Sequence, residues 1–262
     1  MGATCRNLKI ITVFILVAYP CRATTIVAVH TRGQVLLAAD GQITYYVGNK
    51  TWTGKGCKII RTSNCAFAAR GVLLQTAAHF NLQNLGQQAC QSSANLPDVV
   101  ANFAKIARDP ILKGLGAVRA DEPKSYRRNV WNQAAIEVVF AGYDRNRQPT
   151  AIIKRYQVNA SNQVEEPPAE TVGINPSFKK AIAVAYAGEY AAIQSFLTAN
   201  PTWIDVTPPL EIARKLLQLE IHSKARGVGK PIAILRIGTD GISWIDRGAC
   251  TDQSQNSPGG SP

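Results

Sequence analysis

The chain has 262 residues, the length of one large domain, and its formal net charge is +12 at pH 7. The basic residues are spread along the sequence and do not gather with aromatic residues into a stripe, so we expect no nucleic-acid partner. The three histidines lie far apart and no Cys-X-X-Cys pair occurs, so we expect no metal site and no bound cofactor.

Residues 1–23 have the pattern of an export signal. Basic residues precede a short apolar run at residues 10–19, and two small residues, Cys21 and Ala23, lead to the expected cleavage point. The apolar run is too short to span a bilayer, which takes about 20 residues. We therefore expect a signal peptide that is cut after Ala23, export to the periplasm or the medium, and a mature chain that begins at Thr24.

Four cysteines remain after that cleavage: Cys57, Cys65, Cys90 and Cys250. An even number of cysteines in an oxidising compartment allows two disulfides, and the sequence leaves all three pairing schemes open. Cys57 and Cys65 flank a short predicted hairpin, so these two could face each other.

The first half of the mature chain predicts strands followed by two helices. Alternating apolar residues predict a first hairpin whose return strand ends at Asp40, beside the start of the first strand. A polar, extended excursion is expected over residues 42–56. An amphipathic helix is expected over residues 71–91, and a second one from Asp98 to Ile106, with its continuation past Pro110 left open. The expected strands are residues 24–30, 34–39, 58–61 and 65–69.

The second half repeats the order of strands and then helices. Residues 116–132 are charged and predicted to be irregular, whereas residues 176–197 and 210–225 are predicted to be helical. Residues 251–262 are rich in Ser, Gln, Gly and Pro, and this tail is expected to be disordered. The expected strands are residues 134–143, 150–157, 231–237 and 242–246. Sheets with separate pairs of helices indicate a layered α+β sandwich.

Thr24, Asp40 and Lys58 form the candidate catalytic set. A threonine hydroxyl is a weak nucleophile and needs a base. The α-amine of an N-terminal threonine, with a pKa of about 7.7–8.0, can accept the hydroxyl proton near neutral pH. A Lys58 ammonium would stabilise the developing alkoxide, and Asp40 would hold that ammonium in place. The backbone N–H groups of Ala69, Arg70 and Gly71, expected where a strand turns into a helix, would stabilise an oxyanion.

The start of the mature chain resembles a proteasome β-type subunit, and it is especially similar to the bacterial ATP-dependent peptidase of that family. The match extends over residues 24–75, with a two-residue insertion at Tyr45-Tyr46 that aligns the family's catalytic lysine with Lys58 rather than Lys55. The residues that carry it are Thr24-Thr25-Ile26-Val27-Ala28-Val29, Gly33, Ala39-Asp40-Gly41-Gln42, Gly48-Asn49 and residues 54–61.

The resemblance implies the N-terminal nucleophile hydrolase fold over residues 24–250. This fold is a four-layer αββα sandwich, in which two stacked antiparallel sheets lie between two helix layers. The resemblance also implies a threonine peptidase with Thr24, Asp40 and Lys58 as its catalytic residues.

Two supporting features of that family are altered here. The family has a Gly-Ser-Gly turn before the third helix, and the corresponding stretch, residues 173–177, offers Asn175 or Ser177 in place of its serine. A later Asp and Ser hold the N-terminal amine in many members. The matching residues 224–229 contain neither, although Ser223 or Glu220 would stand nearby.

Our leading prediction is an exported threonine hydrolase that cleaves peptide or amide bonds through an acyl-enzyme on Thr24. Its substrate would be a peptide or a non-peptide amide, such as a cell-wall fragment or an acyl amide. Because a compartment outside the cytoplasm normally lacks ATP, we expect no ATP-driven unfoldase, whereas the resemblance implies a homo-oligomeric ring. The alternative prediction, favoured by the missing serine and acid, is a catalytically weakened relative that acts as an assembly or binding module.

Overall fold

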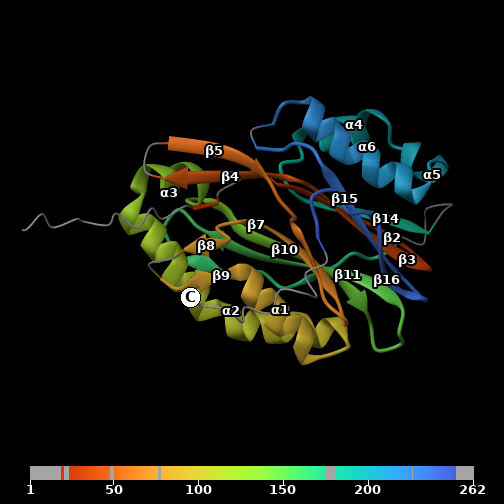
Figure 1. Ribbon diagram of the computed structural model, residues 1–262, viewed down its shortest axis with the longest axis horizontal. Helices are drawn as coiled ribbons and strands as arrows, with labels where there is room; N and C mark the ends of the chain where they lie inside the picture. The colour runs from red at the N-terminus through yellow and green to blue at the C-terminus, as the bar shows by residue number, and fades with distance from the viewer. Residues whose placement is uncertain are drawn as a thin grey trace, which may run out of the picture.

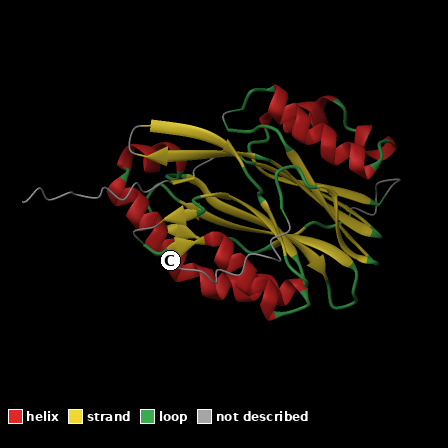
Figure 2. Cartoon of the chain, in the orientation of Figure 1, coloured by secondary structure: helices red, strands yellow, loops and turns green. Residues whose placement is uncertain are grey.

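Two antiparallel sheets stack face to face, and helices cover the outer side of each one (Figure 1, Figure 2). A computed structural model describes residues 19–20, 24–47, 50–75, 78–174, 181–225 and 227–251, without the side chains of residues 19–20, 44–47 and 50–51. The layers follow the order helix, sheet, sheet, helix, so the predicted αββα sandwich is confirmed.

The first sheet has the strand order β14-β2-β3-β15-β16. Its strands are β14 (Ile182–Gly188), β2 (Thr25–Thr31), β3 (Gln34–Asp40), β15 (Ile232–Gly238) and β16 (Gly241–Asp246). Its outer face is covered by α4 (Ala191–Ala199) and α6 (Pro209–His222), which lie with the short α5 (Trp203–Val206) at the upper right of Figure 1.

The second sheet has the order β12-β11-β10-β7-β6, with β13 also paired to β11. Its strands are β12 (Val164–Glu165), β11 (Pro149–Val158), β10 (Gln133–Tyr143), β7 (Ala66–Gly71), β6 (Ile59–Arg61) and β13 (Glu170–Thr171). Its outer face packs against α1 (Leu82–Ser92) and α2 (Leu96–Asp121), and α3 (Pro123–Asn129) follows α2. Shorter pieces lie beside this frame: β1 (Tyr19–Pro20), β4 (Gln42–Val47), β5 (Lys50–Lys55), β8 (Leu74–Gln75) and β9 (Phe80–Asn81).

The strands of the first sheet are buried on both faces, because successive side chains point to opposite sides of a strand. On β2, Ile26 and Ala28 pack in the layer between the sheets, while Val27 and Val29 pack against the helices α4 and α6. Burial of one such aliphatic side chain contributes about 1.5–3 kcal/mol. The alternation therefore fixes which residues of β2 face the second sheet.

The second sheet follows the same rule. Phe67 of β7 and Phe140 of β10 point away from the first sheet and pack with Phe103 of α2. The ring centroid of Phe140 lies 5.6 Å from that of Phe67 and 5.1 Å from that of Phe103. This aromatic cluster joins α2 to the sheet and leaves the opposite strand faces for the layer between the sheets.

The helix predicted over residues 176–197 is wrong in its first part. Residues 182–188 form the strand β14, which pairs along β2 from Ile182 opposite Thr31 to Gly188 opposite Thr25. Alanine-rich sequence favours helix in isolation, but pairing with a central strand outweighs that weak preference. The helical part, α4, begins only at Ala191.

Two other helix boundaries also differ from the prediction. The first helix begins at Leu82 rather than Gly71, because Gly71 continues β7 with a positive φ of 100° and pairs with Ile136 of β10. The segment of residues 116–132, predicted to be irregular, is mostly helical: α2 continues to Asp121 through an internal proline, and α3 follows. Val118 of α2 and Tyr126 of α3 are buried in the core on the outer side of the second sheet, and their burial stabilises these helices.

The segments predicted to be a signal peptide and a disordered tail lie mainly outside the described residues. Of the expected signal peptide, only β1 is described, and it pairs with β4. The tail from residue 252 onward is not described. Among the described helices, none has the length and hydropathy needed to cross a bilayer.

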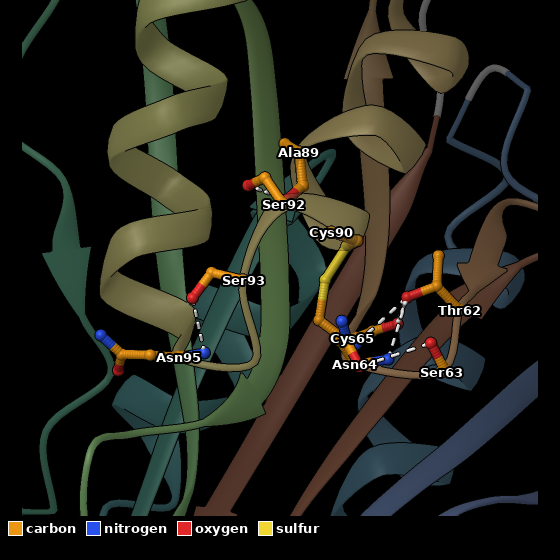
Figure 3. The surroundings of a disulfide bond; sticks show 9 residues. All are labelled: Thr62, Ser63, Asn64, Cys65, Ala89, Cys90, Ser92, Ser93 and Asn95. Carbon is orange, nitrogen blue, oxygen red and sulfur yellow. Dashed lines mark hydrogen bonds between the residues drawn. A yellow bond between two sulfur atoms is a disulfide. The ribbon is translucent and has the colours of Figure 1, made fainter.

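The two disulfides are Cys57–Cys250 and Cys65–Cys90. The prediction that Cys57 could face Cys65 is wrong, because the β6–β7 hairpin turns tightly at Cys65, whose carbonyl accepts the Thr62 N–H, and Cys57 lies at its open end. Figure 3 shows Cys65 at this turn, linked to Cys90 of α1. One disulfide thus ties α1 to the second sheet, and the other ties the end of the described chain to the residue before Lys58.

Replacing either cysteine pair by serine should lower the free energy of unfolding, because each disulfide restricts the unfolded chain. The separations are 193 residues for Cys57–Cys250 and 25 residues for Cys65–Cys90. Loop entropy predicts losses of up to about 5 and about 3 kcal/mol, respectively. Urea unfolding of the two double variants measures both losses, and a non-reducing peptide map that linked Cys57 to Cys65 would contradict the assignment.

Candidate functional site

A buried ion pair joins the two sheets. Lys58, just before β6, places its Nζ 2.9 and 3.0 Å from the two carboxylate oxygens of Asp40, at the end of β3. Their side chains are 5% and 0% exposed. Asp40 also accepts backbone N–H groups from Thr25 at 2.9 Å, Gly229 at 3.0 Å and Gln42 at 3.2 Å. The two residues predicted from sequence therefore meet.

Burial dominates the ionisation of this pair. Desolvation raises the pKa of Asp40 above its usual value, although Lys58 and the backbone donors oppose the shift. Desolvation likewise lowers the pKa of Lys58, although Asp40 opposes it. Lys58 therefore gives up its proton more readily than a solvated lysine does.

Thr24 is held beside this pair through its main chain. Its carbonyl accepts the Glu189 N–H at 3.1 Å, and the next residue, Thr25, donates its hydroxyl to the Glu189 carbonyl at 2.8 Å. Thr24 is 6% exposed. Within the described part of the chain, no hydrogen bond joins the Thr24 hydroxyl to Asp40 or Lys58. The Asp40 carboxylate instead binds the N–H of Thr25, the residue that follows Thr24.

The segment Gly188-Glu189 lies against the Thr24 main chain. Gly188 has a φ of 94°, and a Cβ at this position would overlap the Thr24 carbonyl oxygen. Only glycine allows this close approach without strain. Asn175 and Ser177 lie outside the described residues. In the sequence, the feature that marks the Gly188-Glu189 segment is a glycine at the end of an apolar run, shortly before a helix.

Among the described residues, the hydrogen bonds of the Ser223 and Glu220 side chains lie at α6 and α4. The Ser223 hydroxyl donates to the Glu220 carbonyl at 2.8 Å, and the Glu220 carboxylate accepts the Ile193 N–H at 2.9 Å. These contacts join α6 to α4. The following segment instead supplies the Gly229 backbone, whose N–H binds Asp40 and whose carbonyl accepts the Gly41 N–H.

The segment proposed as an oxyanion donor, Ala69-Arg70-Gly71, forms the end of β7 and does not begin a helix. It pairs with β10, from Val138 opposite Ala69 to Ile136 opposite Gly71. On its other side, β7 pairs with β6 only as far as Ala68, which lies opposite Ile59, the residue after Lys58. Donors from this segment would therefore come from a strand edge rather than from a helix N-terminus.

Sequence reasoning missed a second charged cluster, centred on Glu137 of β10. Glu137 accepts the Arg70 Nε–H, the Arg155 Nε–H at 2.8 Å and the Gly188 N–H at 3.0 Å. Burial alone would raise the Glu137 pKa, but the two arginines and the Gly188 N–H together lower it below its usual value. The signal was a single carboxylate within an otherwise apolar strand.

A polar cavity of about 690 Å³ opens beside this cluster. Arg70, Glu137 and Arg155 line it from the second sheet, and Glu189 and Tyr190 line it from the end of β14. Glu189 also binds the Thr24 main chain, so this one residue connects the cavity to Thr24. Within the residues that the structure describes, no group of His, Cys, Asp and Glu side chains is arranged to hold a metal ion.

The sequence matches no protein-family model and no curated protein. The fold is similar to that of the Gly-1 mutant of Anbu from Hyphomicrobium sp. strain MC1, with a TM-score of 0.52 and 14% sequence identity. The alignment covers 88% of this chain and 89% of the Anbu chain. At this identity the likeness concerns the fold alone.

Glu137→Gln should destabilise the protein by about 3 kcal/mol at neutral pH, because it leaves two arginines facing an uncharged partner. A lowered pKa in the folded state means that this stabilisation is present above pH 4.5 and is lost as the pH falls below it. Between pH 7 and pH 3, the free energy of unfolding measured with urea should therefore fall less for Glu137→Gln than for wild type. Glu211→Gln, exposed on α6, is the control, and parallel pH profiles for wild type and Glu137→Gln would contradict the prediction.

Proposed function

We propose that this protein is an exported threonine-type N-terminal nucleophile hydrolase that cleaves peptide or other amide bonds. The observation that carries the proposal is the buried Asp40–Lys58 pair, with Nζ 2.9 Å from Oδ1, one residue away from Thr24 through the Thr25 N–H. The proteasome-like fold supports the same class of reaction. A buried lysine held by a carboxylate is suited to stabilise negative charge that develops nearby.

The proposed reaction begins once hydrolysis of the Ala23–Thr24 bond frees the Thr24 α-amine. This amine takes the hydroxyl proton while Oγ1 attacks the carbonyl carbon of the substrate amide. The tetrahedral intermediate then collapses, the C–N bond breaks, and the leaving amine takes the proton. Water, deprotonated by the same α-amine, hydrolyses the resulting ester and restores the Thr24 hydroxyl.

Lys58 and the β7 edge would act on the charges of this reaction. The Lys58 ammonium would stabilise the developing Oγ1 alkoxide, with Asp40 fixing its position. The N–H groups of the Ala69-Arg70-Gly71 edge would stabilise the oxyanion. The polar cavity beside Glu189 offers room for the substrate next to Thr24.

Export is part of the proposal. The two disulfides are typical of proteins from oxidising compartments, which supports a location outside the cytoplasm. Peptides or small amides that enter the site directly are therefore the proposed substrates, without an ATP-driven unfoldase. A homo-oligomeric ring is the assembly that the proteasome-like fold suggests, and gel filtration of the processed protein would test it.

A catalytically weakened assembly or binding module is the second candidate function. It is favoured by one observation: the residue that binds the Thr24 carbonyl is Glu189, an acidic residue rather than a serine. The hydrolysis assay below separates the two candidates.

The first prediction from the proposal concerns the N-terminus. Protein recovered from the exported fraction should begin at Thr24, because small residues precede this cleavage point. N-terminal sequencing or intact mass checks this directly. A secreted chain that begins at any other residue has no free Thr24 amine and would contradict the mechanism.

The second prediction concerns amide hydrolysis by the processed chain. Thr24→Ala should reduce the hydrolysis of fluorogenic peptides to background, and Thr24→Ser should retain activity. Lys58→Ala should lower kcat by about 100-fold or more, because it removes the charge beside the developing alkoxide. Lys105→Ala, exposed on α2, is the matched lysine control. Equal rates for wild type and Thr24→Ala would refute the hydrolase and favour the binding module.

A further inference from the structure

Glu189 lies directly opposite Thr24 in the first sheet. The antiparallel register of β14 and β2 places Gly188 opposite Thr25, and the next pair along this register is Glu189 and Thr24. The hydrogen bond from the Glu189 N–H to the Thr24 carbonyl, at 3.1 Å, confirms that the pairing continues. Side chains of directly opposed residues lie on one face, with Cβ atoms about 4.5–5.5 Å apart.

That shared face is the one toward the second sheet. Ala187 and Ile26, the inward neighbours of Glu189 and Thr24 on their strands, both pack in the layer between the sheets. Glu189 follows the end of β14 and lines the cavity together with Arg70 and Glu137 of the second sheet, which places it on the side toward that sheet.

The other charged groups near Glu189 are already bound to one another. On the second sheet, Arg70 and Arg155 bind Glu137. On the far side of Thr24, Lys58 binds Asp40. The remaining titratable groups of the cavity are the phenols of Tyr186 and Tyr190. Among the described residues, the half-buried Glu189 carboxylate forms no hydrogen bond or ion pair, so it has acceptor capacity facing Thr24.

We propose that Glu189 is a positioning residue whose carboxylate binds the α-ammonium of Thr24 once that amine is free. This inference rests on the proposed function for its catalytic meaning, and it assigns to a carboxylate the support that the resemblance gave to a serine. The Glu189 N–H already fixes the Thr24 carbonyl, and the Glu189 carbonyl is taken by the Thr25 hydroxyl. The Glu189 carboxylate is therefore the group that would hold the amine beside the Thr24 hydroxyl.

A carboxylate at this distance favours the protonated amine, so it raises the amine pKa. The amine must lose its proton before it can act as a base, and the acidic limb of kcat/KM would therefore lie at higher pH than for an isolated N-terminal threonine. Glu189→Gln keeps an acceptor of the same shape without the charge. Glu189→Ala removes the acceptor as well.

The test uses the processed chain labelled with ¹⁵N-threonine and two readouts. The first readout is the Thr24 α-amine pKa, from its ¹⁵N chemical shift against pH. It should fall by about 1 unit in Glu189→Gln, since the opposite charge is gone. The second readout is the pH profile of peptide hydrolysis. Its acidic limb should shift to lower pH by the same amount as the amine pKa. The limiting kcat should fall about 10-fold in Glu189→Ala, where the amine is no longer oriented, and less in Glu189→Gln, which keeps an acceptor for the amine.

Glu211→Gln is the matched control and should move neither readout. An amine pKa that is the same in wild type and Glu189→Gln overturns the inference, even if the protein hydrolyses peptides. A shifted amine pKa in a protein without Thr24-dependent hydrolysis supports the positioning role and refutes the proposed function. Since Glu189 is half-exposed and makes only main-chain bonds, both variants should fold, and urea unfolding checks this.

Discussion

The buried contact between Asp40 and Lys58 is the constraint around which the rest of the site is arranged. Removing two charges from water costs several kcal/mol per ion, and only good geometry and extra hydrogen bonds offset that cost. Asp40 receives both, from the Lys58 ammonium and from the N–H groups of Thr25, Gly229 and Gln42. Apart from the neighbouring Gln42, these donors come from three separate segments, so satisfying one carboxylate ties the end of β3 to the start of β2, the residue before β6 and the segment before β15.

A second buried carboxylate, that of Glu137, binds the backbone on the opposite side of Thr24. Glu137 binds two arginines within its own sheet, and it also accepts the Gly188 N–H from the other sheet. Gly188 lies against the Thr24 carbonyl. Each sheet therefore supplies one carboxylate that binds a backbone N–H next to Thr24, and the two sheets cannot shift relative to each other without breaking charged hydrogen bonds.

The sequence predicted the parts of the site that depend on local pattern. The alternation on either side of Gly33 predicts a hairpin, and a hairpin returns Asp40 to the start of β2. The sequence did not predict β14, because alanine-rich residues 182–188 become a strand only by pairing with β2. It also missed Glu189 for the same reason, since its place opposite Thr24 exists only once that pairing is known. Long-range pairing thus accounts for the errors at the site.

The position of Thr24 in the sheet bears on how cleavage could create an ordered site. A chain terminus ordinarily frays, unless neighbouring strands hold it. Thr24 precedes a strand that is paired on both sides, to β14 and β3, and its carbonyl is already bound by Glu189. None of these contacts uses the bond to Ala23. Cleavage of that bond would therefore free the nitrogen while the hydroxyl-bearing residue stays fixed, so the nucleophile would be positioned by the folded sheet and only its base would be supplied by processing.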